Sequence, residues 1–253
     1  MTKLFLILGL LTAFSASASE CIAHRGNSSV ELENSLKAIR SAVEVGADGV
    51  EFDVYHSSDE VPFIWHDKKL KRLARNRPGF SCPLDTEVTL LKWQQIKNNC
   101  LLKNGDEIPS LKNILVYLEF KNIRRFIEFK DRPTHKTLKM IEKYNLQRPD
   151  LVSLISFKRR FLRPGHKLRK HSPWWKKVKF LNVNKFWQNP ISKYGIDVHF
   201  ISMPFSFISR LFGRNVGVWT INTKKLLKKA FKKKIKYITT NKPELCLELR
   251  SKN

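Results

Sequence analysis

The stretch Gly49-Val50-Glu51-Phe52-Asp53-Val54 decides the fold and the site of this 253-residue chain. Successive side chains of a strand point to opposite faces, so Glu51 and Asp53 share one face and the apolar residues share the other. Two carboxylates on one face are unfavourable unless a cation compensates them, and hard divalent cations prefer such oxygen ligands. The stretch predicts a strand with a metal-binding face, although a solvated edge strand would show the same spacing.

A second stretch, Phe126-Ile127-Glu128-Phe129-Lys130, repeats this alternation of charged and apolar residues. Glu128 would add a third inward carboxylate and complete a metal-binding set. Lys130 would lie on the same face, where it can meet a phosphate oxygen. Taken alone, the stretch favours a structural Glu-Lys pair on the face of the strand.

Outward from these stretches, short apolar runs alternate with segments of helical period, which favours repeated β-α units and a mostly parallel sheet. Eight strands are predicted, near residues 21–24, 49–55, 62–66, 126–130, 151–156, 178–183, 216–221 and 237–239. Helices are predicted over residues 35–45, 134–144, 206–212 and 224–233, and residues 68–110 form the longest connection. Eight parallel strands close into a barrel, so the predicted fold is α/β, a single TIM-type (β/α)8 barrel.

Two histidines end predicted strands, His24 the first and His66 the third. Active sites of such barrels are built at the carboxyl ends of the strands. Two histidines can serve there as general base and general acid for cleavage of a phosphorus–oxygen bond, and Arg25 can bind the phosphate through two parallel hydrogen bonds. A single histidine at a strand end is more often merely hydrogen-bonded, so the prediction depends on the whole set.

The first 18 residues are typical of a secretory signal peptide. A short positive start is followed by the apolar run 4–14 and by the small residues Ala16-Ser17-Ala18. The run is shorter than the roughly 20 residues that span a bilayer. We therefore expect residues 19–253 to form the exported barrel domain, periplasmic or secreted.

All four cysteines follow the predicted cleavage site, and an oxidising compartment favours disulfides. Three pairings are possible. Cys82 and Cys100 lie in the same long connection, whereas Cys21 and Cys246 belong to the first strand and the last helix, which barrel closure makes neighbours. The predicted disulfides are Cys82–Cys100 and Cys21–Cys246.

The formal charge of +26 is concentrated in the later half of the chain, because residues 151–253 hold 25 Lys and Arg against three acids. Residues 157–180 and 224–236 contain no acid at all. A solvated face explains such runs, but they also suit an anionic membrane surface, and we expect them to form one connected positive region. Nucleic acid is disfavoured because no base-stacking aromatic groove with interleaved arginines is evident.

Taken together, the ordered motifs resemble those of the glycerophosphodiester phosphodiesterases. The motifs that carry the resemblance span nearly all of the chain after residue 21: His24-Arg25-Gly26, Glu33-Asn34-Ser35, Glu51-x-Asp53, His66-Asp67, Ile108-Pro109-Ser110-Leu111, Glu128-x-Lys130, Ser156-Phe157 and Trp219-Thr220-Ile221-Asn222. The resemblance implies a barrel that hydrolyses small glycerophosphodiesters to sn-glycerol 3-phosphate and an alcohol. It implies one divalent cation, Mg²⁺ or Ca²⁺, on Glu51, Asp53 and Glu128, and acid-base catalysis by His24 and His66. Substrate binding falls to Arg25, Glu33, Lys130 and Trp219.

One departure from the family pattern lies beside the predicted site. The family usually has Thr-Asp-x-Pro where this chain has Thr240-Asn241-Lys242-Pro243, so an amide replaces an acid. Two other functions use the same residues: a lipid phosphodiesterase of the sphingomyelinase or lysophospholipase D kind, and a non-catalytic barrel that binds anionic lipid. An apolar groove around Trp65 and Trp219 would favour the first, whereas a binding scaffold has no need of two histidines and three carboxylates.

Overall fold

The computed structural model describes residues 19–184, 195–199 and 215–252. The predicted signal peptide of residues 1–18 and the predicted helix 206–212 lie outside the described residues. Among the helices of the described ranges, none is long and apolar enough to cross a membrane.

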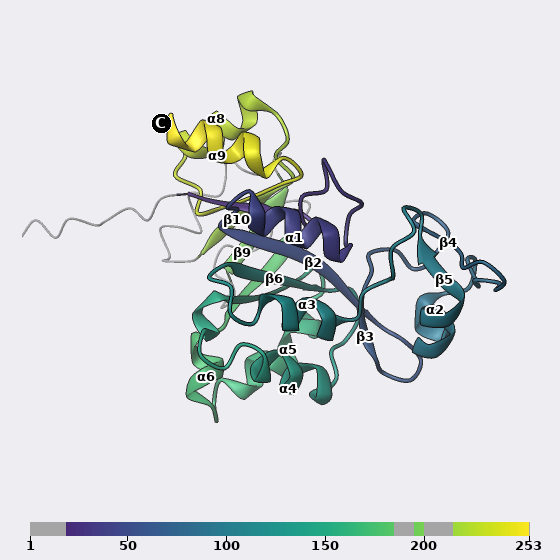
Figure 1. Ribbon diagram of the computed structural model, residues 1–253. Coiled ribbons are helices and arrows are strands. Elements are labelled where there is room, and N and C mark those ends of the chain that lie inside the picture. Colours follow the sequence, from purple (N-terminus) through teal and green to yellow (C-terminus); the bar gives the residue numbers. More distant parts are fainter. Residues whose placement is uncertain (1–18, 185–194, 200–214, 253) are drawn as a thin grey trace, which may run out of the picture.

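Within these ranges, eight parallel strands form a closed barrel, which confirms the predicted fold (Figure 1). In order around the ring the strands are β1 (Glu20–Ala23), β2 (Gly49–His56), β6 (Arg124–Phe129), β7 (Val152–Ser156), β8 (Lys179–Asn184), β9 (Gly195–His199), β10 (Val216–Trp219) and β11 (Tyr237–Thr240). The ring closes because β1 pairs with both β2 and β11, with Ala23 in register with Val50 and Thr240.

The membership of the ring differs from the prediction at two strands. The predicted third strand is β3 (Pro62–Ile64), which runs antiparallel to β2 and lies outside the ring. A short apolar run has the same pattern in a parallel and in an antiparallel strand, so periodicity alone does not predict that β2 and β3 pair antiparallel. The missed ring strand is β9, which is only five residues long and has just two apolar side chains, Ile196 and Val198, with Asp197 between them.

Helices cover the outside of the ring, and three of the predicted ones are confirmed as α1 (Leu36–Glu44), α4 (His135–Lys143) and α8 (Lys224–Lys232). Each of the three begins after a Ser or Thr whose side chain accepts a hydrogen bond from a first-turn backbone N–H, which satisfies a donor that the helix itself leaves free. The further helices are α3 (Leu111–Leu118), α5 (Arg159–Leu168), α6 (Pro173–Lys177) and α9 (Pro243–Ser251), with 3₁₀ turns at Val88–Leu90 and Pro149–Leu151.

Apolar packing divides into a layer outside the ring and a plug inside it. Val50, Phe52 and Val54 pack outward against the helices, as their alternation with the acids predicts. The inside plug consists of side chains from several strands: Ile22, Phe126, Ile155, Leu181, Val183 and Tyr237. Glu128 lies two residues beyond Phe126 on the same face of β6, so the barrel interior changes from apolar to charged toward the carboxyl ends of the strands.

The long connection forms a small unit beside the barrel (Figure 1). Its strands β4 (Ala74–Asn76) and β5 (Cys100–Leu102) pair antiparallel, and α2 (Trp93–Asn99) packs with them around a separate apolar core. Both predicted disulfides are present, Cys82–Cys100 within this unit and Cys21–Cys246 between β1 and α9.

Candidate active site

Three buried carboxylates converge at the carboxyl ends of two neighbouring strands. Glu51 and Asp53 lie on β2 and Glu128 on β6, and the register of the two strands sets Asp53 opposite Glu128. One oxygen from each carboxylate lies within 4.8 Å of the other two. The structure thus brings together the three acids that the alternating patterns singled out.

Two cationic side chains compensate this negative charge. The Lys130 ammonium lies 2.9 Å from Asp53 Oδ1 and 2.5 Å from Glu128 Oε1. The Arg25 guanidinium Nε is 3.1 Å from Asp53 Oδ2, and the Arg25 backbone N–H donates to Glu51 Oε2 at 2.9 Å. Both cations belong to the residues predicted to bind substrate.

Burial and neighbouring charges separate the pKa values of the three acids. Burial, together with the charges of Asp53 and Glu128, raises the pKa of Glu51 well above its usual range. Burial also raises the pKa of Glu128 to about 7, although Lys130 opposes the shift. For Asp53 burial is outweighed by Lys130 and Arg25, which hold its pKa below the usual range.

One carboxylate oxygen of this group is buried without a partner. Glu51 Oε1 has no hydrogen-bond partner among the described residues, while Oε2 of the same group accepts from Arg25. A buried anionic oxygen without a donor is costly, and a hard cation is the ligand such an oxygen fits. The donor set of three carboxylates therefore fits a divalent cation.

A fourth inward acid, Asp197 on β9, is not among the site residues predicted from the sequence. Its carboxylate Oδ1 is buried and unpartnered within the described part of the chain, and burial together with the charge of Glu128 raises its pKa to about 8. Gly217 on β10 lies opposite it, and a side chain there would come within 2.7 Å of Asp197 Oδ1. The stretch Gly195-Ile196-Asp197-Val198-His199 alternates as Glu51-Phe52-Asp53 does, and that alternation was the available signal.

His24 reaches the site directly from a ring strand. It follows β1, its backbone N–H donates to Thr240 O, and its Nε2 lies 3.9 Å from Glu51 Oε2. Its Nδ1 lies 2.7 Å from Oδ1 of Asn241, the residue that departs from the family pattern. Burial lowers the pKa of His24 to about 4, with a further contribution from the charge of Arg25.

His66 reaches the same site by another route, which corrects the prediction that it ends a ring strand. It follows the antiparallel β3, and the backbone N–H of Trp65 donates to Asp53 O at 3.0 Å. This bond holds the returning segment against β2. His66 Nδ1 lies 2.7 Å from Asp67 Oδ1, and burial lowers the pKa of His66 while the charge of Asp53 opposes the shift.

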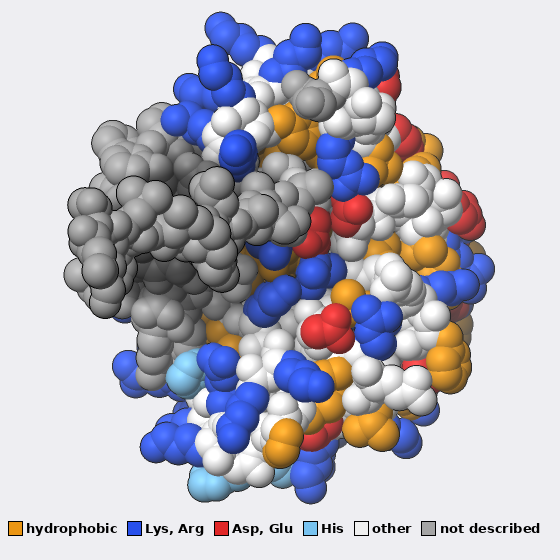
Figure 2. All heavy atoms as spheres, turned by 90° about the vertical axis from the view of Figure 1, so that its left-hand side faces the viewer, with side chains coloured by type: hydrophobic (Ala, Val, Ile, Leu, Met, Phe, Trp, Pro, Cys, Tyr) orange, Lys and Arg blue, Asp and Glu red, His pale blue; other side chains and the backbone are white. Residues whose placement is uncertain are grey.

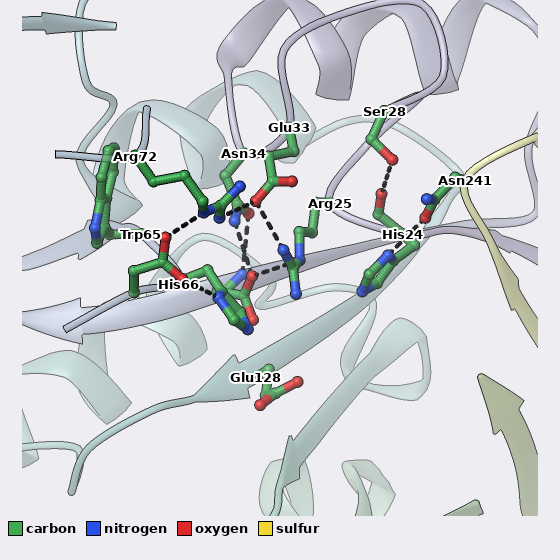
Figure 3. A network of polar contacts seen from close by, with 12 residues as sticks. His24, Arg25, Ser28, Glu33, Asn34, Trp65, His66, Arg72, Glu128 and Asn241 are labelled. Carbon is green, nitrogen blue, oxygen red and sulfur yellow. Dashed lines mark hydrogen bonds and ion pairs between the residues drawn. The ribbon is translucent and has the colours of Figure 1, made fainter. Parts of the chain in front are cut away.

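A second set of polar contacts holds these groups in place (Figure 3). Glu33 accepts from Arg25 at 2.7 Å and from Arg72 at 2.6 Å, and Arg72 also contacts Asp67. Asn34 donates to Asp53 Oδ2 at 2.8 Å. Arg72 was not predicted, because only the folded connection brings it back to Glu33; it links the Arg25 side of the site to the His66 side.

Trp219 lies at the end of β10 and forms an apolar side of the mouth. Its ring packs edge-on against Phe157 at 5.4 Å, and its Nε1 donates to Asp197 O. The Lys130 ammonium lies 5.8 Å from the Phe157 ring centre. Trp219 is therefore connected through Phe157 to a residue of the charged cluster.

A closed parallel barrel with acids, histidines and cations at the carboxyl ends of its strands is the architecture of a barrel enzyme. Residues 24–245 match the Glycerophosphoryl diester phosphodiesterase family, and the chain belongs to this family. The match covers all of the predicted site residues.

Individual relatives agree with this membership. The chain is 26% identical over 246 residues to a glycerophosphodiester phosphodiesterase of Caldanaerobacter subterraneus, covering 90% of this chain and 96% of that protein. It is 33% identical over 134 residues to human glycerophosphodiester phosphodiesterase 1, covering 52% of this chain and only 40% of the human protein. An Oleispira antarctica phosphodiesterase, solved with the product sn-glycerol-3-phosphate, has the same fold, with a TM-score of 0.74 at 21% identity over 92% of this chain and 97% of that one.

Proposed function

We propose that the protein is an exported phosphodiesterase that hydrolyses small glycerophosphodiesters to sn-glycerol 3-phosphate and an alcohol. The observation that carries the proposal is the convergence of three buried carboxylates with two histidines at one end of the barrel. Family membership supports the reaction class, and the product bound by the Oleispira relative supports the identity of the phosphate product.

Glu51, Asp53 and Glu128 would hold one divalent cation, Mg²⁺ or Ca²⁺. Such a cation supplies charge neutralisation at the phosphate and polarises its phosphorus–oxygen bonds. The unpartnered oxygen of Glu51 and the all-oxygen donor set support this assignment.

Arg25 and Lys130 would bind the phosphate oxygens. Both are partly buried beside the acids, so a phosphate placed at the mouth meets them with little competition from water. Glu33 keeps Arg25 oriented, and Trp219 gives the glycerol or alcohol part an apolar surface to rest against.

The two histidines would move the protons of the reaction. Hydrolysis forms a bond from a water oxygen to phosphorus and breaks the bond from phosphorus to the alcohol oxygen. His24 accepts the proton of the attacking water, since its pKa of about 4 keeps the ring neutral. His66 donates a proton to the leaving alkoxide; burial lowers its pKa, and the charges of Asp53 and Asp67 partly offset that shift in favour of the charged form.

A substrate panel tests the proposal. The protein lacking residues 1–18 is incubated with glycerophosphocholine, glycerophosphoethanolamine, lysophospholipid and sphingomyelin, with and without a chelator. We expect chelator-sensitive release of sn-glycerol 3-phosphate from the two deacylated diesters. Cleavage of the lipids alone would establish the lipid phosphodiesterase instead, and no cleavage would leave a binding protein.

Export has its own test. The apolar run 4–14 and the two disulfides support it. N-terminal sequencing of the protein recovered outside the cytoplasm should begin at Ser19. A chain that starts at Met1 would contradict cleavage.

A further inference from the structure

A second cationic feature lies outside the catalytic cluster. A cavity of about 480 Å³ is lined by four cations, Arg132, Arg160, Arg163 and Lys167, together with Phe161 and Pro164 of α5. No carboxylate is among the described residues that line it. We call these four cations the α5 cluster.

The α5 cluster is electrostatically uncompensated in the part of the chain that the structure describes. None of its four side chains forms an ion pair there. Asp131, the acid next to Arg132 in the sequence, is engaged by His56 at 2.6 Å. Arg160, Arg163 and Lys167 share one face of α5 at helical spacing, where like charges destabilise a helix. A bound anion would relieve that repulsion.

The cluster begins close to the active-site mouth in the chain. Arg132 is two residues beyond Lys130, and α5 begins three residues after the end of β7. Between β7 and α5 lies Phe157, which is 41% exposed and packs edge-on against Trp219. An exposed aromatic ring beside basic side chains is the combination that peripheral proteins use at anionic membranes.

We propose that the α5 cluster docks on the phosphate groups of anionic phospholipids, so that the mouth faces a membrane surface. This inference goes beyond the proposed hydrolysis and does not require it, because docking is a binding event. If both hold, the enzyme meets its substrates where membrane lipids are deacylated, and the reaction that supplies it is the removal of acyl chains from a phospholipid.

The chain provides a matched control in α8, a helix with exposed lysines that lies on the opposite side of the barrel from α5 and α6 (Figure 1). Figure 2 shows Lys and Arg side chains gathered over α8 at its upper edge. Residues 185–194 and 200–214, between β8 and β10, lie outside the described ranges, so the predicted continuity of the two basic regions stays a prediction. Removing equal charge from each region separates a local site from the effect of net charge.

The experiment compares two triple variants with the parent, R160Q/R163Q/K167Q in α5 and K225Q/K228Q/K232Q in α8. Binding to phosphatidylcholine vesicles with and without phosphatidylglycerol is measured by co-sedimentation at low salt. At about 1 kcal/mol for each cation near an anionic surface, the α5 variant should bind the anionic vesicles roughly 100-fold more weakly. The α8 variant should stay within about threefold of the parent, because its lysines would face away from the membrane.

Equal loss in both variants would overturn the proposal in favour of a net-charge effect, and full binding by the α5 variant would overturn it directly. Tighter binding of the parent to an oligonucleotide than to the anionic vesicles, lost in the α5 variant, would also overturn it. Thermal unfolding and hydrolysis of soluble glycerophosphocholine should be unchanged in both variants, which controls for folding. A parent that binds vesicles but hydrolyses nothing would contradict the proposed function and leave the docking intact.

Discussion

His24 and His66 occupy the same mouth and have the same contact distance of 2.7 Å from Nδ1 to an oxygen, yet they differ in support and partner. His24 continues a ring strand and faces the amide oxygen of Asn241. His66 follows an antiparallel strand outside the ring and faces the carboxylate of Asp67. A carboxylate stabilises a charged imidazole and an amide does so less, so the two rings are set for opposite proton transfers.

The comparison leads first to a leaving-group test, where the largest effect is expected. His24→Ala should lower kcat/KM by about 10²- to 10⁴-fold on every diester, because the general base is lost. His66→Ala should lower kcat/KM to a similar extent for glycerophosphocholine. It should lower kcat/KM much less for a diester with a nitrophenol leaving group, because nitrophenolate departs without a proton. Steady-state kinetics on both substrates measures the difference.

If His24→Ala, and not His66→Ala, kept activity on the nitrophenol diester, the roles would be reversed and His66 would be the base. Retained activity on glycerophosphocholine would remove that histidine from the mechanism. Unchanged thermal unfolding is the control, since both side chains lie near the surface of the mouth rather than in the apolar plug.

The sequence could predict the parts of this site that depend on alternation within one strand. Glu51, Asp53 and Glu128 were found because each lies between apolar residues that must face the helices. The prediction that His66 ends a parallel ring strand was wrong, because the direction of a three-residue strand depends on the turn before it and not on its own residues. Asp197 was missed because a single acid in a five-residue strand looks like a loop until neighbouring strands enclose it, and Arg72 was missed because its contacts are made only by tertiary folding.

The pH dependence of metal affinity gives a second prediction, because it depends on the protonation of Glu128 and not on that of either histidine. The pKa of Glu128 is about 7, raised by burial, and binding a cation requires the ionised form. The contribution of Glu128 to affinity should therefore fall by up to about tenfold per unit as the pH drops below 7, in addition to any loss from Glu51, whose pKa burial also raises. Calorimetric titration with Mg²⁺ or Ca²⁺ at several pH values measures this. Affinity that is constant below pH 7 would exclude Glu128 as a ligand.

Changing Asn241, the hydrogen-bond partner of His24, tests whether the partner of each histidine sets its proton-transfer role. Asn241→Asp places a carboxylate at Nδ1, which should raise the pKa of His24 by roughly 1 unit or more above its value of about 4. Because a general base must be neutral, the acid limb of kcat/KM should move to higher pH by the same amount. Saturating metal keeps Glu128 ionised during the measurement. An unmoved acid limb would mean that His24 does not accept the proton.

The smallest expected effect on turnover concerns the disulfides, each of which lies in or beside a segment that adjoins one histidine. Cys21–Cys246 anchors β1, which leads into His24, while Cys82–Cys100 closes a loop in the unit that follows His66. Replacing Cys82 and Cys100 with Ser should cost about 3 kcal/mol of stability by the chain-entropy estimate, mainly within that unit, because the ring is held by its own strand pairing. Arg72 connects this unit to Glu33, so turnover of glycerophosphocholine should fall a fewfold, while turnover of the activated diester, which does not need His66, should stay near the parent value. Equal losses on both substrates would show that the unit supports the whole mouth rather than the His66 side alone.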